Sequence, residues 1–303
     1  MNANSQLAAS ITLLLTAALW GIFWLPLRHI ENLGISGVWA VIAINIVPLL
    51  FLLPLIIYRR RLFFNEFNTK VVVGLAMGGG MAFYAIAVLY TTVLRTTLLF
   101  YMSPIWATLL AMLILKEQVN AKRWLAIATA FAGLLLILTG KDNPDVTTAF
   151  NRGDVFALLS GLFWGYGMVV VKKSAEIPAI DLIPGQYFWA TVIGAVVLLS
   201  TAGNPEFRVP DMQQWMNALP LVTGFYVLLV LPTIFITTRI AQILSPGRVC
   251  LLMMSEVLVA GISAPLIAGE SISLLEWFAG AMILTATVIE VYGTPESTEP
   301  ASE

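Results

Sequence analysis

Eight side chains of this sequence could together recognise a flat or cationic small molecule. Aromatic rings stack on apolar ring systems and attract cations, and each such contact contributes about 0.5–2 kcal/mol. A carboxylate and an amide among the rings could contact the charged groups of an amino acid. The pattern predicts a site that binds a ligand rather than one that transforms it. The candidates are Trp20, Trp24, Tyr84, Tyr101, Trp164, Gln186, Trp189 and Glu256.

Helical spacing brings the two N-terminal tryptophans of this set together. Trp20, Phe23, Trp24 and Leu27 follow the i, i+3, i+4, i+7 pattern, which predicts one face of a continuous helix over 7–27. Aromatic residues also pack helices together and lie at membrane interfaces, so packing is the alternative role of these rings.

The charged and amide candidates have alternatives of their own. Glu256 is the only carboxylate well inside a predicted membrane span, where a charge costs about 2.5–3.5 kcal/mol, so we expect it to face protein or water. It could bind a substrate ammonium group, carry a proton, or pair with a neighbouring helix. Gln186, one turn before Trp189, could contact a ligand or hydrogen-bond a neighbouring helix. Glu290 lies near the end of the last span and is expected to be solvated.

Two features predict bending of the helices. Pro104 removes a backbone hydrogen bond within a span and is the strongest candidate for a kink or gate. Gly79 is the centre of the glycine run 78–80, which permits close helix approach and local bending. The run is not a phosphate-binding loop, because no Lys-Ser/Thr pair follows it.

Residue types that catalysis or metal binding needs are scarce. The chain has one histidine, one cysteine, no HExxH pattern and no carboxylate cluster. We therefore expect no metal and no cofactor, and a membrane-embedded enzyme or a channel is a less favoured alternative. The net charge of −1 gives no basic footprint for nucleic acid.

The elements that position the candidates are predicted to be membrane helices. Hydrophobic residues make up 59% of the 303 residues and charged residues 11%, against about 25% charged residues in a soluble domain. Eight uncharged segments, and two with one carboxylate each, are long enough to cross a membrane, which takes about 20 residues. The sequence thus predicts an all-α integral membrane protein with about ten transmembrane helices. They are expected at 7–27, 36–57, 71–91, 96–115, 122–140, 154–172, 182–202, 215–237, 246–268 and 274–293.

Lysine and arginine residues indicate the orientation. With a cytoplasmic N-terminus, eleven of the sixteen lie in cytoplasmic loops and five lie outside. The positive-inside rule therefore predicts that both termini are cytoplasmic. The acidic, proline-containing segment 294–303 is expected to be a disordered cytoplasmic tail.

The two halves of the chain resemble each other. The segment 14–21 matches 158–165 at an offset of 144, which aligns Trp20 with Trp164. Farther along the offset is 153, and it aligns Arg95 with Arg248, Glu117 with Glu270, and Trp124 with Trp277. Five helices per half is an odd number, so the second half enters from the opposite side. We predict two inverted five-helix repeats, 7–140 and 154–293, with a substrate site between them.

Several of these residues also resemble a known family. Ala18-Leu19-Trp20-Gly21, followed by Arg28, is similar to the opening helix of the EamA-type drug/metabolite transporters. Tyr101-Met102-Ser103-Pro104, with Glu117 thirteen residues after the proline, resembles the family's fourth helix and its exit, and Gly269-Glu270 repeats the exit. The second half departs from the family, with Glu256-Val257 in place of a Glu-Pro pair. This departure removes the basis for a proline kink there.

The resemblance covers about 7–293 and is closest to the YddG-like exporters of aromatic amino acids and some organic cations. It implies a multi-pass exporter in the bacterial inner membrane. Together with the residues, it predicts export of aromatic and other apolar amino acids by alternating access through a central aromatic-lined cavity. The alternative is an exporter of lipophilic cations or other small metabolites. We expect a monomer whose partners are a small-molecule substrate and membrane lipid.

Overall fold

The computed structural model describes residues 3–22, 24–35, 37–91, 93–139, 150–200, 209–259 and 274–293. The predicted tail 294–303 and the link 141–149 lie outside these residues. Every element within the described residues is a helix. Six stretches are long and apolar enough to cross a membrane: four of them are single helices, and two, Thr96–Ile114 and Met212–Ala241, run over consecutive elements. Shorter apolar helices lie at Ser5–Trp20 and Trp277–Tyr292.

The helices follow one another along the chain without a strand between them in the described residues. The first half contains α1 (Ala3–Trp20), α2 (Trp24–Asn32), α3 (Val38–Tyr58), α4 (Arg60–Phe64), α5 (Phe67–Tyr90), α6 (Val93–Phe100), α7 (Ser103–Ile114) and α8 (Ala121–Thr139). The second half contains α9 (Arg152–Lys173), α10 (Ala179–Ser200), α11 (Met212–Leu221), the π-helix η3 (Val222–Val230), α12 (Leu231–Ala241), α13 (Pro246–Met253) and α15 (Leu274–Gly293).

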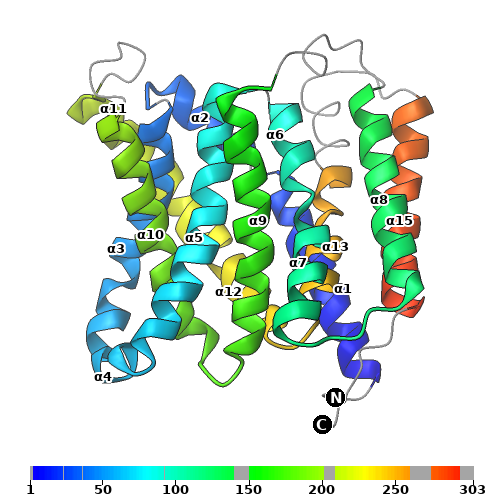
Figure 1. Cartoon of the computed structure of the whole chain (residues 1–303). Helices are drawn as coiled ribbons and strands as arrows, with labels where there is room; N and C mark the ends of the chain where they lie inside the picture. Colours follow the sequence, from blue (N-terminus) through cyan, green and yellow to red (C-terminus); the bar gives the residue numbers. More distant parts are fainter. Residues whose placement is uncertain are drawn as a thin grey trace.

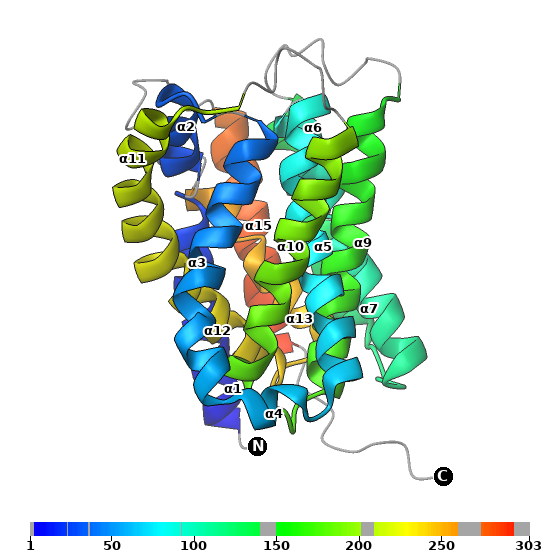
Figure 2. The same cartoon turned by 90° about the vertical axis from the view of Figure 1, so that its left-hand side faces the viewer.

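The long helices lie side by side along one direction. Helix α1 begins and α15 ends at the same end of the bundle, drawn at the bottom of Figure 1 and called the lower end here. Helices α3, α10, α5 and α9 lie next to one another in a row, in this order, in Figure 2. The most extensive contacts join helices of different halves, since α5 packs against α9 and α10, and α8 against α15. The two halves are therefore interleaved.

Glycines permit the close approach of α5 to its neighbours. A Cβ atom on Gly74 would lie 2.6 Å from the backbone of α10, and one on Gly80 would lie 3.0 Å from the backbone nitrogen of Trp164 on α9. A Cβ on Gly78 would collide with the Gln186 carbonyl, and one on Gly79 would lie 2.5 Å from the Phe163 ring. The glycine run thus lets α5 fit closely between α9 and α10.

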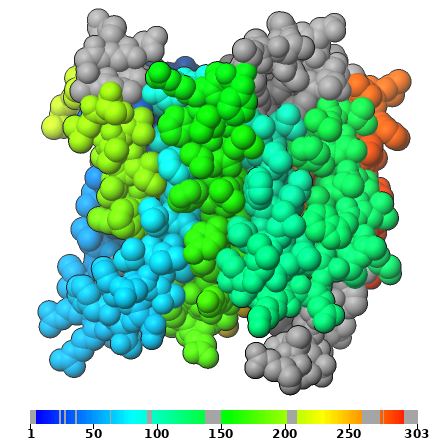
Figure 3. All heavy atoms as spheres, in the orientation of Figure 1, coloured from blue at the N-terminus to red at the C-terminus, as the bar shows by residue number. Residues whose placement is uncertain are grey.

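Large apolar side chains remain on the surface as well as in the core. Helices α7, α8, α9 and α10 form much of the face drawn in Figure 3. They carry exposed apolar residues such as Leu113, Leu125 and Phe188. Met168 and Leu182 are buried between the helices. An apolar exterior around an apolar interior is the arrangement expected of helices in lipid.

The predicted continuous helix over 7–27 is wrong. Helix α1 ends at Trp20, and α2 begins at Trp24 after a turn. Pro26 explains the interruption, because in a continuous helix its ring would collide with the carbonyl of Ile22, and it offers no N–H for a helical bond. Trp20 and Trp24 therefore belong to two helices and share no continuous helix face.

Two further predicted helices are interrupted or distorted, and the span expected at 246–268 is interrupted by a turn at Met254–Ser255. The span expected at 96–115 is divided into α6 and α7 by a turn at Tyr101–Met102. The span expected at 215–237 contains η3, where the amide of Leu231 bonds the carbonyl of Tyr226, five residues back. Pro232, the second residue after η3, cannot supply a regular helical bond, which favours a wider turn at this place.

Candidate functional site

Two helix interruptions lie at matching places in the two halves. The first is the turn Tyr101–Met102, and the second is the turn Met254–Ser255 after α13, beyond which 256–259 is again helical. The offset of 153 between the halves superimposes one turn on the other. In each, the amide of the second residue bonds the carbonyl three residues back, at 3.3 Å and 3.2 Å. Such tightened turns leave fewer regular helical bonds and form natural joints.

A proline accounts for the first interruption only. Pro104 lies in the first turn of α7, where its missing N–H costs little, and its ring would collide with the Phe100 carbonyl in an unbroken helix. The matching residue in the second half is Val257. The helix is interrupted there nonetheless, so the departure from the family's Glu-Pro pair does not abolish the break.

One hydrogen bond joins the two interruptions. The Tyr101 hydroxyl donates to Oε1 of Glu256. Tyr101 is 3% exposed, and Glu256 is half-buried. Glu256 follows Pro246, the first residue of α13, by ten residues, about 15 Å along a helix and half of a hydrocarbon core about 30 Å thick. Two candidate residues from different halves are thus in contact deep in the span.

Phe100 links three of the predicted aromatic side chains. Its ring centroid lies 5.1 Å from that of Tyr84, 5.4 Å from that of Tyr101 and 6.2 Å from that of Trp164. We call these four residues the aromatic cluster. The Tyr84 hydroxyl lies 3.0 Å from the Thr97 Oγ1 atom. Sequence reasoning missed Phe100, because a phenylalanine in an apolar helix carries no signal that separates it from a lipid-facing one.

The two candidates on α10 lie apart from this cluster in their contacts. Gln186 is 2% exposed, and its Nε2 atom donates to the sulfur of Met81 on α5 at 2.7 Å. Trp189 is half-buried, and its ring lies 5.5 Å from that of exposed Phe188. Gln186 therefore joins α10 to α5 in this conformation.

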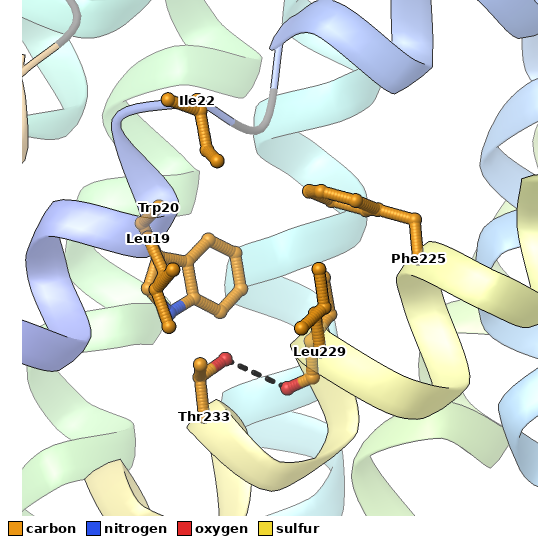
Figure 4. Close-up of a pocket in the computed structure, with 7 residues that line it drawn as sticks. Leu19, Trp20, Ile22, Phe225, Leu229 and Thr233 are labelled. Atoms are coloured by element: carbon orange, nitrogen blue, oxygen red, sulfur yellow. Dashed lines mark hydrogen bonds between the residues drawn. The ribbon is translucent and has the colours of Figure 1, made fainter.

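Trp20 lines a pocket between α1, η3 and α12. Figure 4 shows its indole ring facing Phe225 and Leu229, with Thr233 below, whose hydroxyl donates to the Val230 carbonyl at 2.7 Å. The space between these atoms is about 240 Å³, part of it open to the outside. The lining residues are Leu19, Trp20, Ile22, Phe225, Leu229, Val230 and Thr233.

The sequence predicted one cavity lined by all eight candidate residues, and this pocket contains only part of that set. Of the eight candidates, Trp20 lines it. Tyr84, Tyr101 and Trp164 instead contact one another through Phe100. The side chain of Trp24 falls outside the described residues.

Polar contacts close the lower end of the bundle. Arg59, after α3, binds both carboxylate oxygens of Asp181 at the start of α10, at 2.7 Å and 2.8 Å. The hydrogen bond and the charge of Asp181 raise the pKa of Arg59 above its ordinary value. Gln242, after α12, donates to the Ile177 carbonyl at 2.7 Å, and Lys172 donates to the Ile243 carbonyl. The Arg59–Asp181 contact thus ties the first half to the second at this end, and the other two contacts join segments of the second half.

Glu290 is not solvated, contrary to the expectation from sequence. It is fully buried on α15, and Oε1 lies 3.0 Å from Nη2 of Arg123 on α8. Arg123 also approaches Glu117 at 4.0 Å. A carboxylate close to a helix end can be removed from water when a guanidinium on the next helix balances its charge. Sequence reasoning missed the pair because 167 residues separate its members.

The described residues contain no group of three or more His, Cys, Asp or Glu side chains that could hold a metal ion. The sites for which the structure offers chemistry are the aromatic cluster with Glu256 and the apolar pocket at Trp20.

Apolar spans, interrupted helices and a half-buried carboxylate beside aromatic rings together define a multi-pass membrane protein of transporter type. The family model described as the EamA-like transporter family matches residues 7–139 and 151–292. The chain belongs to this family.

Its relatives carry transporter names without a stated substrate. The chain is 28% identical to the uncharacterized transporter YoaV of Bacillus subtilis over 188 residues, which are 60% of this chain and 62% of YoaV, less than two thirds of that relative. It is 27% identical to an uncharacterized transporter of Archaeoglobus fulgidus over 223 residues, 73% of this chain and 76% of the relative. A crystal structure with 14% identity and a TM-score of 0.70 covers 94% of this chain and 96% of its own, a likeness of fold alone.

Proposed function

We propose that the protein is a secondary transporter that exports aromatic and other apolar amino acids across the bacterial inner membrane by alternating access. The observation that carries the proposal is the aromatic cluster beside the two helix interruptions, with Glu256 hydrogen-bonded to Tyr101. Ring stacking suits an aromatic side chain. Interrupted helices supply the substrate sites of many secondary transporters.

The architecture in this proposal is ten spans in two inverted repeats, 7–140 and 154–293. Opposite chain directions support it, since α1 runs upward and its counterpart α9 runs downward in Figure 1. Matching contacts support it too: α6 meets α9 as α13 meets α1, and α5 meets α9 as α12 meets α1. Both interruptions fall at the same repeat position.

The lower end is the cytoplasmic end in this proposal, with both termini on that side. The contact of Arg59 with Asp181 holds the two halves together at this end. The Trp20 pocket lies at the other end of α1. Substrate from the cytoplasm would enter after the Arg59–Asp181 contact separates and would leave on the opposite side as the two halves rock.

Export of lipophilic cations is the second candidate. Glu256 next to aromatic rings also suits a delocalised cation, through charge and cation–π attraction. Phosphorylated sugars are disfavoured, because such anions would need several cationic side chains within the spans.

Flux measurements in proteoliposomes test the proposal. Tryptophan, phenylalanine, threonine and a dicationic drug are offered with and without a pH gradient, and we expect saturable flux of the aromatic amino acids. Trp164→Leu should lower their kcat/KM at least tenfold, because a buried ring of the cluster is lost. Trp124→Leu, a change at a half-exposed ring at the start of α8, is the matched control and should keep it. Absence of saturable flux of any amino acid would contradict the proposal.

A further inference from the structure

We propose that Glu256 recognises the ammonium group of the transported molecule, and that this ammonium group exchanges with the Tyr101 hydroxyl on the carboxylate. The inference rests on the proposed transport function and specifies the chemical group of the substrate that is read. It makes a primary amine a requirement, whereas stacking on the aromatic cluster alone would accept any flat apolar ring.

The balance of charge is the first argument. Among the described residues three other carboxylates are buried, and two of them have a guanidinium partner, Asp181 with Arg59 and Glu290 with Arg123. The third, Asp154, lies in the first turn of α9 and accepts a hydrogen bond from the Asn151 amide. Glu256 forms no ion pair with any residue that the structure describes, and its hydrogen-bond partner there is the neutral hydroxyl of Tyr101. A carboxylate about half-way through a span is costly without a countercharge. The Tyr101 hydroxyl offers the carboxylate a hydrogen bond but no positive charge, whereas an ammonium group offers both, so an ammonium group is the better partner.

The surroundings of the carboxylate are the second argument. Tyr101, which holds Glu256, is in ring contact with Phe100, and Phe100 is in ring contact with Tyr84 and Trp164. Aromatic faces attract cations by about 0.5–2 kcal/mol and repel anions from the same position. A carboxylate joined to this cluster therefore selects for positive charge and for a flat ring in one ligand.

The position of both groups at helix interruptions is the third argument. Tyr101 is part of the turn between α6 and α7, and Glu256 directly follows the turn after α13. Their hydrogen bond ties the first half to the second at these two joints. Replacement of the hydroxyl by an ammonium group breaks this tie, so binding of the amine removes one contact between the halves at their joints. Binding would thus be coupled to the movement that alternating access requires.

The test compares two ligands that share an indole ring. Tryptamine carries an ammonium group, and indole-3-propionate carries a carboxylate instead. Equilibrium binding of each radiolabelled ligand to the purified full chain is measured for the wild type and for Glu256→Gln, which retains an oxygen acceptor for Tyr101. We expect the wild type to prefer tryptamine, and Glu256→Gln to lose at least tenfold in tryptamine affinity without losing affinity for indole-3-propionate.

Two further variants keep the test decisive. Glu176→Gln removes an exposed carboxylate at the lower end and should leave both affinities unchanged. Tyr101→Phe retains the carboxylate and removes the competing hydroxyl, so tryptamine should bind as tightly as to the wild type or more tightly. A wild type that does not bind tryptamine, a Glu256→Gln variant with unchanged preference, or a Tyr101→Phe variant that loses tryptamine binding would each overturn the proposal.

Failure of the transport function would look different. A protein that binds tryptamine through Glu256 but exports no amino acid in the flux assay would refute the proposed function and support the ammonium site. A protein that exports aromatic amino acids with unchanged kinetics in Glu256→Gln would support the function and refute the ammonium site.

Discussion

The buried ion pair between α8 and α15 makes a quantitative prediction about stability. Arg123→Met leaves the fully buried Glu290 without its guanidinium, and removal of one member of a buried pair costs about 3–5 kcal/mol. Glu290→Leu should cost less, because Glu117 still approaches Arg123 at 4.0 Å. The double variant replaces both charges by apolar side chains and should regain most of the lost stability, since such exchanges are often neutral.

The single cysteine of the chain provides the assay. Cys250 is buried on α13, so a maleimide that becomes fluorescent on reaction reports thermal unfolding in detergent. For a chain of this size, 1 kcal/mol corresponds to a shift in Tm of about 2 °C. We expect Arg123→Met to lower Tm by about 6–10 °C and the double variant to unfold within about 3 °C of the parent.

The double-mutant cycle also defines the result that refutes the reasoning. If both single variants unfold within about 2 °C of the parent, the ion pair carries no stability. If the double variant unfolds at a temperature lower than either single variant, the two charges do not act on each other. The exposed-site change Glu176→Gln is the control and should leave Tm unchanged.

Three further predictions concern packing, gating and orientation. Gly78→Leu should destabilise the protein by about 1–3 kcal/mol in the same maleimide assay, because α10 leaves no room for a side chain at this position. Gly224→Ala is the control and should be tolerated, because a Cβ atom on Gly224 meets open space. Arg59→Gln removes a contact that closes the lower end. If that contact stabilises the closed state by about 1 kcal/mol, the affinity for a substrate that enters at this end should rise up to about fivefold. An unchanged affinity in an equilibrium binding assay would argue against a gate. Glu176→Cys, made in a Cys250→Ala background, should react with a membrane-impermeant maleimide from the cytoplasmic side alone. Labelling of this cysteine in intact cells would show that the protein has the opposite orientation.

Composition predicted the helical character of the fold, and the glycine run predicted one close approach between helices. A long apolar segment with few charges is expected to be helical in lipid, and six described helical stretches meet that description. The run around Gly79 predicted close approach, and its neighbours meet the backbone of α9 and α10. These features are local, so a single sequence contains them.

Interruptions within spans were only partly predictable. Pro104 predicted the turn between α6 and α7. Pro26 indicates the end of α1 in the same way, but the aromatic spacing over 20–27 favoured a continuous helix there. The turn at Met254–Ser255 has no such residue, because Val257 is compatible with a helix. There the repeat offset, rather than local propensity, marks the place.

Contacts between distant helices were the hardest part of the site to predict. Glu256 stood out as a charge within a span, yet its partner Tyr101 lies 155 residues away. Phe100 and the Arg123–Glu290 pair gave no local signal either. Sequence reasoning could identify the unusual residues but not the pairs that they form.

The interleaving of the two halves has a consequence for biosynthesis. Helix α8 packs against α15, α5 packs against α9 and α10, and Arg248 on α13 bonds Ser10 on α1. When the ribosome has finished the first half, none of these partners has yet been made. The early helices must wait in the bilayer as separate inserted segments until translation of the second half is well advanced. Each repeat is thus a unit of sequence without being a unit of folding, and two halves expressed as separate chains should be stable only when they are produced together.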